Sequence, residues 1–145
     1  MLALERAHTV LVVDWPSTDV PDTLVRAGYA VVVKGGPEPD RYSVRELNRG
    51  EVVSRKLTDP PQQVDLVNCH RPVQELFSIA ALAKALGAGM VWRQSGLDRD
   101  GRRHPKGCWA PREEAEQARD LVESADLIYV DDRYIADVVR QIRRG

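Results

Sequence analysis

Short apolar runs alternate along this chain with stretches in which apolar residues recur every three or four positions. The runs cover residues 9–13, 29–33, 64–67, 90–92 and 126–130, and most of them end at polar or turn-forming residues. Continuous apolar runs of this length, in which Val is common, are typical of strands buried on both faces of a parallel sheet. We therefore predict one strand at each run.

The stretches between the runs predict helices, because their apolar residues fall on one helical face. Ser17 or Thr18 can cap the first helix, and Gly28 ends it. The second helix starts at Pro72, since a first helical residue needs no N–H donor. The predicted inward residues of the four helices are Leu24, Val25 and Ala27; Val73, Leu76, Phe77, Ala80, Ala83 and Leu86; Ala115, Ala118, Leu121 and Val122; and Ile135, Val138, Val139 and Ile142.

Two segments do not follow this alternation of strands and helices. Residues 38–63, which follow a predicted loop at 34–37, are less regular, and we expect a helical turn at 44–47 and a short edge strand at 51–54. Residues 97–110 contain the turn signals Asp100-Gly101 and Pro105-Lys106-Gly107 among several basic residues. We interpret residues 97–110 as an inserted loop.

The alternation of strands and helices predicts an α/β fold. We expect a three-layer, Rossmann-like sandwich with a mostly parallel sheet of five or six strands, formed by residues 1–145 as a single domain. The strands at 9–13 and 64–67 should be neighbours at the point where the strand order reverses. Ligands bind beyond the carboxyl ends of the strands at such a point, so the turn at 68–72 is the prime candidate for the wall of a site.

Composition narrows the function classes. The chain has 145 residues, a formal net charge of -1 and two cysteines. This charge gives no reason to expect a nucleic-acid partner, and no apolar run approaches the roughly 20 residues of a membrane span. The first residues show no leader pattern, and two cysteines are too few for a disulfide framework. We expect a cytoplasmic protein with a small-molecule ligand.

Four segments resemble a known family. They are Ala27-Gly28-Tyr29, residues 64–67 leading to Arg71-Pro72, residues 91–96 (Val-Trp-Arg-Gln-Ser-Gly), and Asp132-Arg133-Tyr134-Ile135. Together they resemble the small CoA-binding proteins, whose Rossmann domain is similar to the N-terminal domain of the succinyl-CoA synthetase alpha subunit. The first loop, the loop at 34–37 and the insert at 97–110 depart from the family pattern. The resemblance implies a Rossmann-like fold and CoA, with NADP as the alternative, as the ligand.

The candidate ligand-binding residues follow the predicted strand ends. They are Asp14, Trp15, Pro16, Ser17 and Thr18 after the first strand, Lys34 and Gly35 after the second, Arg71 and Pro72 after the third, and Gln94 and Gly96 after the fourth. Helix N-terminal amides and cations suit phosphates, and an aromatic side chain suits adenine.

Each candidate also has a simpler explanation. The first loop contains no GxGxxG motif, so residues 14–18 form either a phosphate loop or only a capped helix. Lys34, assisted by Arg41, binds a ribose phosphate or is solvated. Arg71 either forks onto a phosphate or pairs with Asp65 or Glu75. Trp15 stacks on adenine or packs against the first helix, whereas Trp92 lies in an apolar strand and is predicted to be core.

The sequence gives less support for other kinds of site, such as a metal centre. Cys69, His70, His104 and Cys108 are metal-ligand types, but adjacent residues such as Cys69 and His70 point to opposite sides of an extended chain. We assign no metal and expect Cys69 to be a buried apolar residue. The basic residues of the insert, Arg99, Arg102, Arg103 and Lys106, form a lid over phosphates or a solvated loop.

The sequence favours a binding protein over an enzyme, because no paired carboxylates and no nucleophile beside a base stand out. The first hypothesis is non-catalytic binding of CoA or a related phosphorylated adenine nucleotide. The second is an NADP-dependent oxidoreductase, for which His70 or Tyr134 would supply the proton. The third is a diverged domain that has lost its nucleotide and acts through protein contacts, as a homodimer or with another partner.

Overall fold

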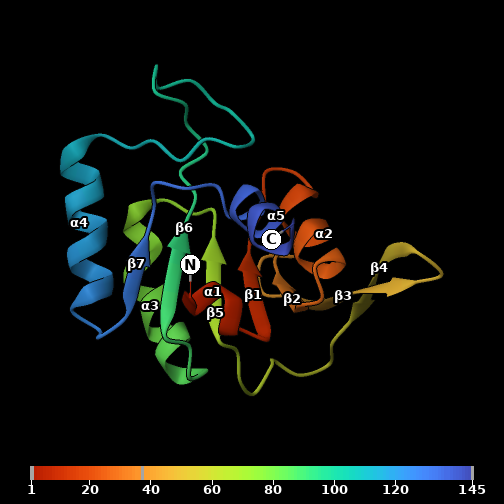
Figure 1. The fold of residues 1–145 in the computed structure, drawn as a ribbon. Coiled ribbons are helices and arrows are strands. Elements are labelled where there is room, and N and C mark those ends of the chain that lie inside the picture. Colours follow the sequence, from red (N-terminus) through yellow and green to blue (C-terminus); the bar gives the residue numbers. More distant parts are fainter. Residues whose placement is uncertain (1, 37, 145) are drawn as a thin grey trace.

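A seven-stranded mixed sheet is the centre of the computed structural model, which describes residues 2–36 and 38–144 (Figure 1). Pro37, part of the loop predicted at 34–37, lies outside the described residues. The strands are β1 (Thr9–Val13), β2 (Ala30–Lys34), β3 (Tyr42–Asn48), β4 (Glu51–Lys56), β5 (Leu66–Cys69), β6 (Met90–Arg93) and β7 (Ile128–Val130). The helices are α1 (Leu2–Arg6), α2 (Asp19–Arg26), the 3₁₀ helix η1 (Val73–Glu75), α3 (Leu76–Ala85), α4 (Arg112–Glu123) and α5 (Ile135–Arg144).

The strand order is β4-β3-β2-β1-β5-β6-β7. Five of these strands run parallel, namely β2, β1, β5, β6 and β7. The prediction that the first and third predicted strands are neighbours is confirmed, because β1 pairs with both β2 and β5. Val13 lies opposite Lys34 on one side and opposite Cys69 on the other. The ends of these three strands are therefore level, and the loops that follow them meet at one edge.

Helices cover both faces of the sheet, as predicted. Along β1, Val10 and Val12 pack with α1, α2 and α5, whereas Leu11 and Val13 pack with α3 and α4. This alternation follows from the two-residue period of a strand. None of the described helices is long and apolar enough to span a membrane.

The sheet has seven strands, whereas five or six were predicted, because residues 42–56 form a β-hairpin. The edge strand expected at 51–54 is confirmed within β4, but the helical turn expected at 44–47 is wrong, since those residues lie in β3. β3 runs antiparallel to both β2 and β4. Arg49 and Gly50 form the turn with φ values of 53° and 82°. Two consecutive positive φ angles give the tight turn that matches strand twist.

Candidate functional site

The loops that follow β1, β2, β5 and β6 lie at the same edge of the sheet. The backbone N–H of Asp14 donates to the carbonyl of Lys34 at 3.0 Å. In the same way, the N–H of Gln94 donates to the carbonyl of Cys69 at 2.8 Å. These bonds extend the strand ladders by one residue, so the structure brings most of the sequence-predicted site residues together.

Arg71 is the centre of an ion-pair network at this edge. Its Nη1 lies 3.1 Å from Asp14 Oδ2, and its Nε donates to Glu75 Oε2 at 2.9 Å. The hydrogen bond to Glu75, assisted by that to Asp14, raises the pKa of Arg71 above its usual range. The predicted pairing with Glu75 is confirmed, whereas Asp65 instead accepts the N–H groups of residues 8 and 9. Arg71 is therefore one cation held between two carboxylates.

The start of α2 carries Asp19 and Asp22. Asp19, the nearer of the two to the first loop, is paired with Arg140 of α5. Asp19 accepts bonds from Arg140 at 3.0 Å and from the Tyr134 hydroxyl at 2.7 Å. The hydrogen bond from Arg140 is the main reason that the pKa of Asp19 is lowered. Ser17 Oγ accepts the N–H of Asp19 at 3.4 Å, whereas the Thr18 side chain forms no cap. The acidic charge beside the first loop is thus offset by a cation.

Gln94 and Gly96 hold the inserted loop. Gln94 is 2% exposed, and its amide donates to the Pro105 carbonyl at 2.6 Å. The N–H of Gly96 donates to the carbonyl of Gly107 at 2.9 Å, and Gly96 accepts the N–H of His104 at 2.8 Å. These bonds attach the segment 97–110 to the end of β6, beyond which it projects from the sheet (Figure 1). Gln94 is therefore an anchor for the loop.

Gly96 also makes room for His70. It has a φ of 79°, and a Cβ there would lie closer than 3.0 Å to His70 Cε1. The His70 Nδ1–H donates to the carbonyl of Gln94 at 3.2 Å. The β5 and β6 loops are thus packed so closely that only glycine fits at this position.

Three adjoining hollows form what we call the carboxyl-edge crevice. The main hollow has a volume of about 650 Å³ and is lined by Pro16, His70, Ser95, Gly96, Leu97, Arg103, His104 and Pro105. A second, of about 350 Å³, shares His70, Ser95 and Leu97 with it and reaches Asp14, Arg71 and Pro72. A third, of about 360 Å³, shares Pro105 and reaches Ser17, Lys106 and Arg140. The main hollow alone is within the roughly 300–1,000 Å³ of ordinary ligand sites.

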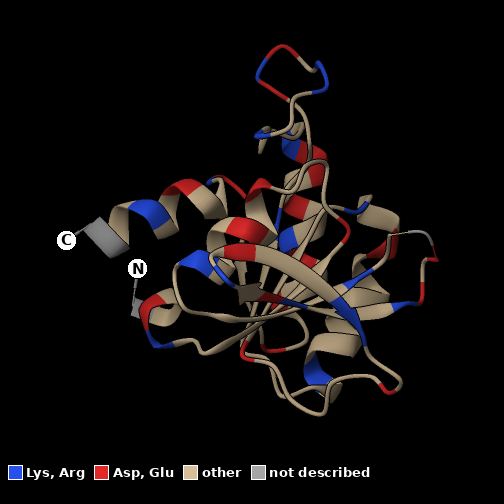
Figure 2. Cartoon of the chain, turned by 90° about the vertical axis from the view of Figure 1, so that its right-hand side faces the viewer, with Lys and Arg blue, Asp and Glu red and all other residues tan. Residues whose placement is uncertain are grey.

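The inserted loop forms part of this crevice. Arg103 and Lys106, two of the four basic residues predicted as a lid, line it, whereas Arg99 and Arg102 are not among its lining residues. Figure 2 shows that acidic positions accompany the basic ones on the projecting loop. The predicted turn is present, because Asp98 Oδ1 accepts the N–H of Arg102 at 3.0 Å. The loop thus supplies selected cations to the crevice.

Residues at the end of β2 lie on the other side of the first loop. Lys34 Nζ lies 3.4 Å from the exposed Asp40 carboxylate and also 3.4 Å from the Pro39 carbonyl. Trp15 packs against the α2-side core, and the guanidinium carbon of Arg45 lies 5.3 Å from the centre of its ring. Gly35 has a φ of 123° and lies beside the Trp15 ring. Trp15 therefore already has a cation on one face of its ring.

Trp92 and Cys69 are core residues, as predicted. Both are fully buried, and the Trp92 indole donates to the Arg133 carbonyl at 2.7 Å. Burial raises the pKa of Cys69 to about 12. Among residues 2–36 and 38–144, no group of three or more His, Cys, Asp and Glu side chains is placed to hold a metal ion.

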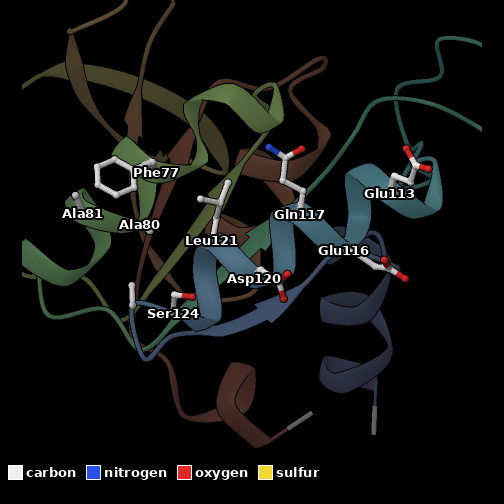
Figure 3. Close-up of a pocket in the computed structure, with 10 residues that line it drawn as sticks. Phe77, Ala80, Ala81, Glu113, Glu116, Gln117, Asp120, Leu121 and Ser124 are labelled. Carbon is white, nitrogen blue, oxygen red and sulfur yellow. The ribbon is translucent and has the colours of Figure 1, made fainter.

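Another hollow lies away from this edge, between α3 and α4 (Figure 3). It has a volume of about 730 Å³ and an apolar floor, and Glu113, Glu116 and Asp120 line it. The prediction that Phe77 points into the core is wrong, because Phe77 is 72% exposed at this groove. The described lining of this hollow has three carboxylates and no base, whereas that of the carboxyl-edge crevice has four carboxylates and five Lys or Arg side chains, so charge favours the crevice for a nucleotide.

Sequence reasoning missed the site residues of the hairpin. Ser43, Arg45 and Ser54 face Trp15 only because residues 42–56 form two strands. The signal that indicates this hairpin is the Asn48-Arg49-Gly50 turn between residues with strand propensity.

A Rossmann-like sheet with a crevice at its carboxyl edge places this chain in the class of doubly wound α/β proteins, whose ligands bind at that edge. The family model for the CoA binding domain matches residues 12–136, and this chain therefore belongs to that family. The resemblance read from the sequence is confirmed.

Solved structures show the same fold. One is the crystal structure of Prb, described as the PH1109 protein redesigned for binding, with a TM-score of 0.59, 21% identity, and coverage of 98% of this chain and 87% of that one. Another is the structure of cell-free ID.343 from Thermus thermophilus, with a TM-score of 0.55, 25% identity, and coverage of 98% and 94%. Comparison with curated proteins gives no match.

Proposed function

We propose that this chain binds CoA, or a related phosphorylated adenine nucleotide, in the carboxyl-edge crevice and does not transform it. The observation that carries the proposal is a crevice of ligand size beside the switch point between β1 and β5, in a chain of the CoA-binding domain family. Arg103 lines the crevice and suits the phosphates, beside Lys106 and Arg140, which are paired with Asp137 and Asp19, while Pro16 and Leu97 offer apolar surface. The chemistry of these residues fits the group.

Two titratable groups near the crevice, Tyr134 and Cys69, support binding over catalysis. The hydroxyl proton of Tyr134 is donated to Asp19, and burial raises the pKa of this phenol above its usual range. The Cys69 thiol is buried, with a pKa of about 12. Neither side chain is poised as a proton donor or nucleophile near neutral pH.

A thermal-shift titration with CoA, acetyl-CoA, NADP and NAD tests the proposal. A ligand at 100 times its Kd stabilises the folded state by about 2.7 kcal/mol. At roughly 2–4 °C per kcal/mol for a chain of this size, the melting temperature should rise by roughly 5–11 °C with CoA. No shift with any of the four compounds would contradict the proposal, and a shift with NADP alone would favour an oxidoreductase.

A variant pair locates the site. Arg71→Ala leaves Asp14 and Glu75 without their cation beside the bound phosphates, so CoA affinity should fall about tenfold or more. Arg112→Ala is the matched control, because Arg112 is exposed on α4 and pairs with Glu116. Equal affinities of the two variants would place the ligand elsewhere. Steady release of free thiol from acetyl-CoA would contradict the absence of catalysis.

A further inference from the structure

A fourth hollow at the carboxyl edge of the sheet lies beyond the end of β2, between the first loop and the hairpin. Its volume is about 200 Å³, and Trp15, Gly35, Arg41, Ser43, Arg45 and Ser54 line most of it. This is smaller than the roughly 300–1,000 Å³ of sites that enclose a whole ligand. The hollow therefore suits one group of a larger ligand.

The two arginines of this hollow lack the partners that other inward-facing arginines have. The Nε atoms of Arg41 and Arg45 are buried and have no hydrogen-bond partner. The described residues that line the hollow include no carboxylate. Arg71, by contrast, is held by two acids. Buried polar groups in native proteins are nearly always satisfied, so two unsatisfied guanidinium nitrogens beside one hollow point to an anion from outside the chain.

The hairpin arranges these groups on one face. Ser43 lies opposite Val33 of β2, and Arg45 lies opposite Ser54 of β4. Alternate residues of a strand share a face, so residues 43 and 45 point to the same side, toward Trp15. The ring of Trp15, 5.3 Å from the Arg45 guanidinium, orients this cation. Two guanidinium forks and two hydroxyls are the groups that bind phosphate oxygens.

The fourth hollow adjoins the carboxyl-edge crevice. Trp15 lines the fourth hollow, Pro16 lines the main hollow, and Ser17 lines the third. Consecutive Cα atoms are only about 3.8 Å apart. A nucleotide lying across the first loop therefore reaches both sides of it.

We propose that Arg41, Ser43, Arg45 and Ser54 form a subsite for a phosphate monoester, which we call the hairpin phosphate subsite. It takes the ribose phosphate of the nucleotide bound in the crevice, and in this it rests on the proposed function. Lys34, the residue predicted for this role, has Asp40 and a backbone carbonyl as partners. The hairpin, rather than the end of β2, distinguishes CoA from a ligand without this phosphate.

The test compares CoA with dephospho-CoA, which lacks only the ribose phosphate, by isothermal titration calorimetry. The wild-type chain should bind CoA at least tenfold more tightly. In Arg45→Gln this preference should disappear, while the affinity for dephospho-CoA stays the same. Arg55→Gln is the matched control and should keep the preference, because Arg55 lies in the same hairpin, is 59% exposed and pairs with Glu46. Arg41→Gln repeats the test if Arg45→Gln does not fold by circular dichroism.

The outcomes separate the two proposals. Equal binding of CoA and dephospho-CoA to the wild-type chain overturns the hairpin phosphate subsite and leaves the proposed function standing. Loss of the preference in Arg55→Gln as well as in Arg45→Gln also overturns it. If neither compound binds, the proposed function fails. The hairpin phosphate subsite is then tested by itself, by titrating the chain with inorganic phosphate and following binding by ³¹P NMR. Binding that Arg45→Gln abolishes supports an anion subsite for free phosphate, and no binding overturns it.

Discussion

The packing of Gly96 against His70 gives a sharp expectation for the substitution Gly96→Ala. Gly96 has a φ of 79°, and an added Cβ would lie within 3.0 Å of His70 Cε1. The His70 ring must then move, and its hydrogen bond to the Gln94 carbonyl is lost. Since His70 and Gly96 both line the carboxyl-edge crevice, the substitution should weaken ligand binding as well as the fold.

The cost has three parts. A non-glycine residue in the left-handed region costs about 1–2 kcal/mol, from which the stiffer unfolded chain subtracts about 0.4–1 kcal/mol. The lost hydrogen bond costs about 0.5–1.5 kcal/mol, and the forced shift of a packed side chain costs about 1–3 kcal/mol. We therefore expect the free energy of unfolding to fall by about 3–4 kcal/mol. The melting temperature should fall by about 10 °C.

Gly50→Ala is the control that isolates the backbone contribution. Gly50 has a φ of 82°, but no atom lies within 4 Å of an added Cβ. Gly50→Ala should lower the free energy of unfolding by only about 1 kcal/mol, because only the backbone contribution applies. Urea unfolding of both variants, and of Gly96→Ala in a His70→Ala background, measures the difference. Equal costs for the two glycine variants, or no relief from His70→Ala, would show that contact with His70 does not set the cost at position 96.

Three further outcomes follow from burial and charge. Leu76→Ala should cost about 2–5 kcal/mol in urea unfolding and Phe77→Ala much less, because these neighbours are 0% and 72% exposed. Cys69 should resist alkylation at pH 8 in the folded chain and react after unfolding, as mass spectrometry can show, because it is buried with a pKa of about 12. The pKa of Asp19 is lower in the folded chain than in the unfolded chain, so its pair with Arg140 stabilises the fold fully at pH values above the unfolded-state pKa. This stabilisation is lost as the pH falls through the folded-state pKa of Asp19. The stability gap between wild type and Asp19→Asn should therefore close in acid, and a pH-independent gap would contradict it.

Charge distribution explains why the carboxyl-edge crevice is suited to a nucleotide although the chain is almost neutral. The acids closest to the first loop, Asp14 and Asp19, are paired with Arg71 and Arg140. These arginines come from segments far away in the sequence, and without them the crevice would repel phosphates. The described lining of the groove between α3 and α4 includes three acids and no base, and one of these acids, Glu116, is paired with Arg112 beside the groove.

Most of the fold could be predicted from the sequence because it depends on local patterns. Apolar runs such as residues 9–13 mark strands buried on both faces, and the spacing of Leu76, Ala80 and Ala83 marks a helix. Alternation of the two kinds of element then restricts the topology to a parallel sheet with helices on both sides. The hairpin was not predicted correctly because short mixed runs such as residues 44–47 are ambiguous between helix and strand.

The local pattern of apolar residues is enough to identify most of the elements, the fold class and the residues that follow the strand ends. What those residues do depends on the tertiary structure. Arg71 meets Asp14, 57 positions away, Arg140 meets Asp19, 121 positions away, and Gln94 turns inward to hold the inserted loop. The physical reason is that the period of apolar residues records only which face of an element is buried. Ion pairs, hydrogen bonds and hollows depend on side chains that come together only when the sheet has formed.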